Sequence, residues 1–118
     1  MSYEANGQVF GIFTAANANI ERFRFVQNTG TTVALATAAQ GVLGVCLLDD
    51  PVSGQAVPVQ YSGIAMVEVG SAGVTANGDV EVGTNGTVVD YSAGVKVGKA
   101  LKTAAAGEIT PILLKTGY

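Results

Sequence analysis

Short stretches in which apolar residues alternate with polar ones, or follow one another directly, recur along the whole chain and are separated by turn residues. A period of two is typical of a half-buried strand, and a short apolar run between turn signals is typical of a buried one. The pattern therefore predicts an all-β protein built from short strands. The expected strands are residues 8–13, 20–26, 31–36, 42–48, 55–61, 64–69, 79–82, 87–89, 95–101 and 108–114.

The segment 20–26 has the clearest alternation. Phe23 and Phe25 fall on one face of an extended chain, and Arg22 and Arg24 fall on the other. The segment is predicted to be a half-buried strand.

Turn chemistry predicts one hairpin in particular. Asn85-Gly86 supplies two residues that tolerate positive φ, and it lies between the expected strands 79–82 and 87–89. Helix is expected to be scarce, because the Ala-rich stretches that would accept one are no longer than about two turns. These stretches lie near residues 14–18, 34–40 and 103–106.

The chain also contains a weak internal repeat. Gly44 and Gly98 each lie in an apolar run, and each is followed by a loop, a Gly-Gln or Gly-Glu pair, and a strand containing Pro58 or Pro111. Two units are too few for a solenoid, so they are expected to build the two halves of one small barrel or sandwich. The predicted organisation is a flexible N-terminal arm (1–7) and a single β-domain (8–118), with repeat units at about 28–63 and 84–117.

The prolines of the two repeat units are expected at particular positions in the sheets. Proline cannot donate to a β-ladder, so Pro58 and Pro111 are expected at sheet edges, or where the missing N–H would have pointed outward. Such edges either resist wrong pairing or meet another subunit, and the sequence leaves both alternatives open.

Composition narrows the classes of partner. A chain of 118 residues fits one domain, and only 13% of its residues are charged, with a net charge of −3. So few charges favour association with other proteins, and the acidic balance argues against nucleic acid as a partner. No segment reaches the ~20 apolar residues of a membrane span, and the N-terminus does not have the pattern of a signal peptide. We expect synthesis in a cytoplasm and no membrane partner.

The side chains offer little catalytic chemistry. The absence of histidine removes Ser–His and Cys–His pairs and the usual zinc ligands. Cys46 lies in an apolar run and is expected to be a core thiol rather than a nucleophile. Ser53 and Ser62 precede glycines outside any nucleophile-elbow pattern and are expected in turns. We predict that the chain is not an enzyme and has no catalytic residues and no cofactor.

Two acidic pairs are candidates for a cation site or a catalytic site. Asp49-Asp50, before Pro51, is expected to form a turn; the alternative is a site for a hard cation such as calcium. Asp79 and Glu81 are expected on the solvated side of a strand, with a catalytic pair as the alternative. No metal site is predicted.

The basic residues gather near the end of the chain. Lys96, Lys99, Lys102 and Lys115 are four of the six basic residues. They either serve solubility or form a patch that contacts an acidic protein surface. Asn85-Gly86-Thr87 also matches the glycosylation triplet, but the hairpin is the favoured interpretation.

The order of these elements resembles that of the capsid cement, or head-decoration, proteins of tailed bacteriophages. The resemblance covers nearly the whole chain, and its signatures are structural rather than catalytic. It rests on Tyr3, on Phe23-Arg24-Phe25-Val26, and on residues 42–45, 53–59, 62–65, 95–101 and 106–114.

The resemblance implies a structural virion protein that binds the outer surface of the phage head. The implied partner is the major capsid protein, whose contacts the chain would stabilise as a homotrimer. The alternative function is a carbohydrate-binding or adhesion β-module. Such a module usually needs exposed aromatic residues, and the chain has no Trp; its tyrosines are Tyr3, Tyr61, Tyr91 and Tyr118.

Overall fold

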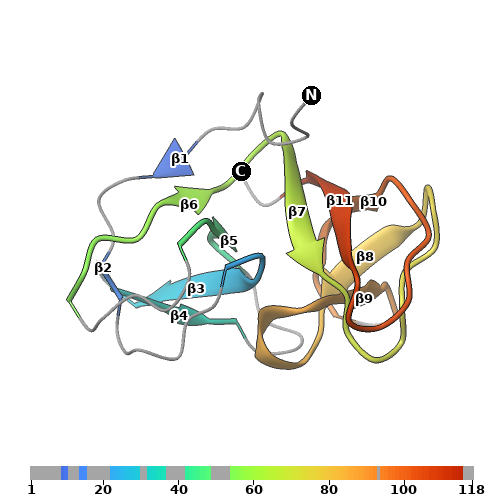
Figure 1. Cartoon of the computed structure of the whole chain (residues 1–118), viewed down its shortest axis with the longest axis horizontal. Coiled ribbons are helices and arrows are strands. Elements are labelled where there is room, and N and C mark those ends of the chain that lie inside the picture. Colours follow the sequence, from blue (N-terminus) through green and yellow to red (C-terminus); the bar gives the residue numbers. More distant parts are fainter. Residues whose placement is uncertain are drawn as a thin grey trace.

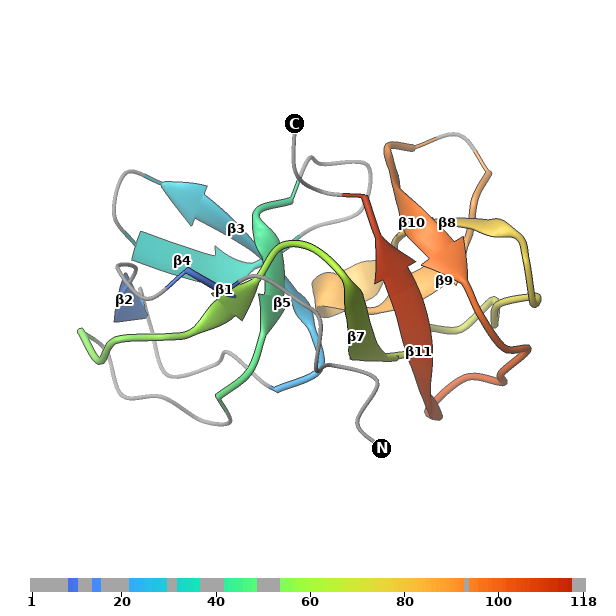
Figure 2. The same cartoon turned by 90° about the horizontal axis from the view of Figure 1, so that it is seen from above.

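The computed structural model shows two curled β-sheets that lie side by side (Figure 1). The view from above shows the same arrangement (Figure 2). The structure describes residues 9–10, 14–15, 22–29, 32–36, 42–48, 54–92 and 94–115, so the expected arm at 1–7 lies outside the described residues. None of the described residues is in an α-helix, and a 3-10 turn, η1 (Thr84–Gly86), is the one helical element among them.

The strands divide between the sheets in chain order. Sheet A has the order β1-β6-β5-β3-β4-β2, and sheet B has the order β7-β11-β10-β8-β9. All neighbouring pairs are antiparallel except β2 and β4, which are parallel. Sheet A contains β1 (Val9–Phe10), β2 (Thr14–Ala15), β3 (Phe25–Thr29), β4 (Thr32–Leu35), β5 (Gly44–Cys46) and β6 (Val59–Gln60). Sheet B contains β7 (Ile64–Glu68), β8 (Asp79–Val82), β9 (Val88–Asp90), β10 (Lys96–Ala100) and β11 (Ile109–Leu114).

Each sheet curls so that one outer strand approaches the other side of the same sheet. In sheet B, Val69 after β7 forms a parallel bridge with Val88 of β9, and the Gly70 N–H donates to the Val88 carbonyl (2.8 Å). In sheet A, Thr14 of β2 forms an antiparallel bridge with Ala56, which leads into β6. The predicted fold class, a small all-β domain with little helix, is confirmed, and the curl is that of a half-barrel.

The two sheets repeat one strand order. The run β1-β6-β5-β3-β4 in sheet A corresponds to the run β7-β11-β10-β8-β9 in sheet B. The parallel pairing of β2 with β4 also has a counterpart, the parallel bridge between Val69 and Val88. The pseudo-repeat seen in the sequence is therefore a repeat of topology.

Gly44 and Gly98 occupy the same position in this repeat. A Cβ at Gly44 would overlap the carbonyl oxygen of Gln60 on the neighbouring β6. A Cβ at Gly98 would overlap the carbonyl oxygen of Leu113 on the neighbouring β11. Both positions require glycine because the adjacent strand approaches too closely for any side chain.

Of the two placements expected for the prolines, the one at sheet edges is wrong. Pro111 lies in β11 and Pro58 directly precedes β6, and both strands are interior to their sheets. The Pro58 carbonyl accepts from the Leu47 N–H (3.0 Å), and the Pro111 carbonyl accepts from the Leu101 N–H (3.2 Å). In an antiparallel strand the N–H and C=O of a residue face the same neighbour, so each missing N–H faces the point where β5 or β10 ends. Each proline keeps one hydrogen bond to that neighbour through its carbonyl, and β5 and β10 end one residue before the position that the missing N–H would face.

The strand predicted over 20–26 is wrong at residues 22–24, because β3 begins only at Phe25; residues 20 and 21 lie outside the described residues. Phe23 adopts a positive φ of 67°, as does Asn77 ahead of β8 in the second sheet. The backbone turns at Phe23, and its carbonyl accepts a hydrogen bond from the Glu68 N–H of β7 (2.8 Å). At Phe23 the chain therefore forms a contact between the two sheets in place of the strand that the alternation predicted.

The hairpin predicted at Asn85-Gly86 is confirmed. β8 and β9 pair as antiparallel strands around η1, and Asn85 and Gly86 have φ values of 55° and 76°. The Ala-rich stretches show no helix where they are described. Thr14–Ala15 is a strand, Ala34 belongs to β4, and Ala104 forms a bridge.

Phe25 joins the cores of the two sheets. It begins β3 in sheet A, is fully buried, and belongs to a cluster composed mainly of side chains from sheet B. Gly86 lies so close to the Phe25 carbonyl that a Cβ there would overlap it. A second cluster lies within sheet A and is formed by Ala15, Val26, Val33, Cys46, Val57 and Val59.

Candidate functional site

The candidate nucleophiles have structural roles. Cys46 is fully buried in the sheet A cluster, and its thiol donates to the Leu48 carbonyl (2.9 Å), as expected for a core thiol. Ser62 lies in the connection between the sheets, and its carbonyl accepts from the side-chain amide of the buried Gln60 (2.9 Å). Ser53 lies outside the described residues, as do Asp49 and Asp50.

The alternation predicted that Glu81 is a solvated strand residue. In the structure its carboxylate also binds the backbone of a neighbouring loop. Its Oε1 accepts from the backbone N–H groups of Ser92 and Gly94 (2.8 and 2.9 Å) and so holds the β9–β10 loop. Asp79 pairs instead with Lys96 (3.3 Å). The two carboxylates serve separate contacts, and no group of three or more His, Cys, Asp or Glu side chains in the described part of the chain could hold a metal ion.

The two described tyrosines lie on different elements. Tyr61 directly follows β6, and Tyr91 directly follows β9. Tyr91 is 40% exposed, and the Lys96 ammonium lies 5.0 Å from the centre of its ring. Tyr3 and Tyr118 lie outside the described residues.

The lysines divide into two groups. Lys96 is engaged with Asp79 and Tyr91. Lys99, Lys102 and Lys115 form no ion pair with any residue that the structure describes. The basic cluster of the sequence therefore supplies three cations on or beside β10 and β11 that are not paired within the described part of the chain.

Apolar side chains cover the outer side of β7 and β11. On β11, Thr110, Ile112 and Leu114 are buried, and by alternation Ile109, Pro111 and Leu113 lie on the opposite side. Ile109 and Leu113 are exposed there, whereas Pro111 between them is buried. The register then places Ile64 opposite Leu113, and Met66 opposite Pro111. We call the surface formed by Ile64, Met66, Ile109 and Leu113 the outer strip.

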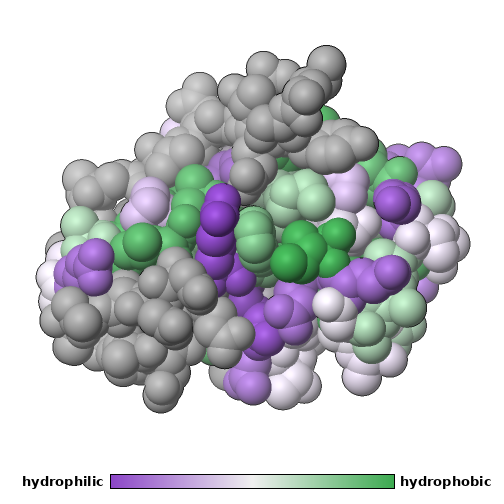
Figure 3. Space-filling view, in the orientation of Figure 1, coloured by the Kyte–Doolittle hydropathy of each residue, from purple (hydrophilic) through white to green (hydrophobic). Residues whose placement is uncertain are grey.

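The outer strip is exposed at both ends of β11. Ile109 is 44% exposed and Leu113 is 36% exposed. Green, hydrophobic residues gather over β7 and β11 in the space-filling view (Figure 3). Lys99 lies opposite Leu113 on β10, and Lys115 follows two positions after Leu113. Two of these three lysines therefore border the strip.

A shallow pocket lies at the Ile109 end of the strip. Its volume is about 150 Å³, and Lys102 and Glu108 are the charged residues in its wall. The Glu108 carboxylate already accepts from the Ala105 N–H (2.7 Å). The pocket is lined by Lys102, Thr103, Ala104, Glu108, Ile109 and Thr110.

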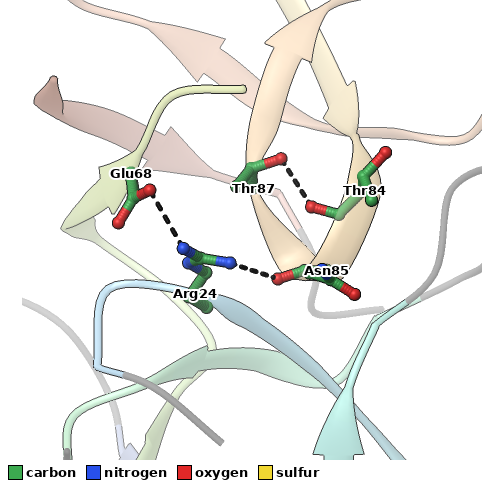
Figure 4. Close-up of polar contacts among 5 residues, drawn as sticks. All are labelled: Arg24, Glu68, Thr84, Asn85 and Thr87. Carbon is green, nitrogen blue, oxygen red and sulfur yellow. Dashed lines mark hydrogen bonds and ion pairs between the residues drawn. The ribbon is translucent and has the colours of Figure 1, made fainter. Parts of the chain in front are cut away.

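Arg24 connects the two sheets (Figure 4). Its Nη2 lies 3.0 Å from Glu68 Oε2 at the end of β7, and its Nη1 donates to the Asn85 carbonyl in η1 (3.1 Å). The side chains of Arg24 and Glu68 are 14% and 31% exposed, so the pair is shielded from solvent. Sequence reasoning missed this contact because it had placed Arg24 on the exposed face of a strand.

We expect the pair to contribute measurably to stability. A double-mutant cycle with Arg24→Met and Glu68→Gln should give a coupling energy of about 1.5 kcal/mol, because the charged hydrogen bond is partly desolvated. The same cycle with Lys96→Met and Asp79→Asn should give about 0.3 kcal/mol, since those side chains are 58% and 46% exposed. Urea denaturation measures both; equal couplings would contradict the assigned role of Arg24.

Among the described residues, no helix is both long and apolar enough to cross a membrane. Comparison with known proteins found no matching family model and no matching curated protein. A solved structure does match: the head fibre gp8.5 N base of bacteriophage phi29. The match has a TM-score of 0.71 at 18% sequence identity, and it covers 93% of this chain and 97% of the other. The chain therefore has the fold of that fibre base along nearly its whole length.

Proposed function

We propose that the chain is a structural protein of a phage head, which binds the major capsid protein on the outer surface of the capsid. The observation that carries the proposal is the match in fold, over 93% of this chain, to the base of a phage head fibre. The sequence resemblance to capsid cement proteins supports the same class of function and does not depend on the match in fold.

The physical character of the chain suits a passive binding role. The described part has no metal-binding cluster, and its charged side chains mostly hold the fold together. Two curled sheets with a shared core form a stiff body, so docking would immobilise few flexible groups. On a capsid the same contact repeats at many symmetric sites, and a homotrimer would multiply weak contacts through effective concentration.

Binding to heads tests the proposal. The purified chain is mixed with precursor heads and with expanded heads of the phage that encodes it, the particles are pelleted, and bound chain per capsid subunit is measured. We expect saturable binding to expanded heads, with a stoichiometry that identifies the symmetry site, and no binding to heads of an unrelated phage.

A failure to bind either form of head would overturn the proposal. A glycan array would then test the alternative of a carbohydrate-binding module. Sedimentation of the free chain tests the homotrimer separately, because a monomer that still binds heads would remove the trimer and keep the capsid role.

A further inference from the structure

Sheet B has apolar residues on both faces, and those on one face are only partly covered. The inner face packs in the shared core, where Val67 and Ile112 are fully buried. The outer strip lies on the opposite face, with Ile109 and Leu113 exposed. A sheet that is apolar on both faces is usually covered on both faces by other protein.

The charges around the strip indicate what kind of surface would cover it. Lys99 and Lys115 border the strip, Lys102 stands at the pocket beside Ile109, and none of them pairs with a described residue. A surface that brings carboxylates to these three lysines and apolar side chains to the strip would complement both features.

The described part of a second copy is a poor source of those carboxylates, because every carboxylate in that part is already engaged within its own chain. Each either pairs with a basic side chain or accepts backbone N–H groups. These carboxylates are Glu68, Asp79, Glu81, Asp90 and Glu108. The complementary charge is best supplied by a different protein.

We propose that the outer strip and its three lysines form the face by which the chain docks on an acidic protein surface, namely the outside of the capsid. This inference rests on the proposed function and names the part of the chain that performs it. The pocket at Lys102 and Ile109 is the place where an acidic side chain of the partner would insert. Once the face is docked, the strip would exclude water around the lysines and so strengthen their attraction to carboxylates.

Charge reversal on this face is the test. Lys99→Glu and Lys115→Glu should each weaken binding to expanded heads by about tenfold, and Ile109→Ser combined with Leu113→Ser should weaken it by a similar factor. Lys96→Glu is the matched control, because it changes the charge equally at a lysine engaged with Asp79; it should change binding less than about twofold. Thermal unfolding verifies that each variant is folded.

The outcomes separate this inference from the proposed function. If the wild-type chain binds heads and the Lys99, Lys115 and strip variants bind equally well, the docking face is wrong and the capsid role stands. If the wild-type chain binds neither form of head, the capsid role and this face both fall. If the free chain is an oligomer that the Ile109 and Leu113 substitutions dissociate, the strip is a contact between copies and the inference is overturned.

Discussion

Replacing Gly44 or Gly98 by alanine should lower the free energy of unfolding by about 3 kcal/mol at either position. The added Cβ would overlap a backbone carbonyl oxygen, that of Gln60 or of Leu113, and a backbone atom cannot move aside as a flexible side chain can. Each substitution must therefore push β5 from β6, or β10 from β11. Urea denaturation at 25 °C measures the effect.

Two other glycines provide matched controls. Gly54 and Gly107 have φ values of 85° and 86°, and a Cβ at either would meet nothing within 4 Å. Alanine there should cost only about 1 kcal/mol, from the left-handed backbone alone. A cost at Gly44 and Gly98 no larger than at the controls would show that the strands can separate without strain.

Replacing Phe25 by alanine should cost about 4 kcal/mol and should also weaken the coupling between the two sheets. Phe25 is fully buried and belongs to the cluster shared with sheet B, so its loss leaves a cavity at the junction. We expect calorimetric and van't Hoff enthalpies to diverge in this variant, because the sheets would no longer unfold as one unit.

Val26→Ala is the control for that second effect. Val26 is equally buried but lies in the cluster internal to sheet A, so its truncation should cost about 2 kcal/mol and leave unfolding two-state. Divergent enthalpies in both variants, or in neither, would contradict the linking role of Phe25.

The local pattern of the sequence predicted most of the strands. The expected segments 79–82, 95–101 and 108–114 correspond to β8, β10 and β11 with bounds that differ by one residue at most. These segments have clear turn signals on both sides, so their ends are marked locally. Agreement was poorer at 55–61, where only Val59–Gln60 is a strand, because the segment runs along the closing edge of sheet A before it pairs.

Features that depend on contacts distant in sequence could not be predicted. The turn at Phe23 forms because β7 and η1 approach Arg24 from 44 and 61 residues away. Alternation alone favoured a strand there, since nothing near Phe23 in sequence marks a positive φ. The interior positions of Pro58 and Pro111 likewise depend on where the neighbouring strands end.

The candidate docking face had a signal in the sequence. Residues 108–114 are apolar at nearly every position from Ile109 onward, and Ile64-Ala65-Met66-Val67 is apolar without interruption. A strand that is apolar at its odd and at its even positions is typical of a sheet that is buried on both faces. The lysines were visible as a cluster. That Lys96 is engaged, and that the other three form no ion pair with a described residue, required the positions of Asp79 and Tyr91.

The repeated strand order sets a problem for folding. Strands with the same neighbours in two adjacent sheets can compete for the same partners, so β6 and β11 risk exchanging places in a collapsed intermediate or between two chains. Residues that differ between the copies act against this exchange. Gln60, whose register counterpart is Leu113, donates its side-chain amide to the carbonyls of Ser62 and Ile64. A leucine in that place would leave both carbonyls without this donor. The divergence of the two halves thus directs each strand to its own sheet.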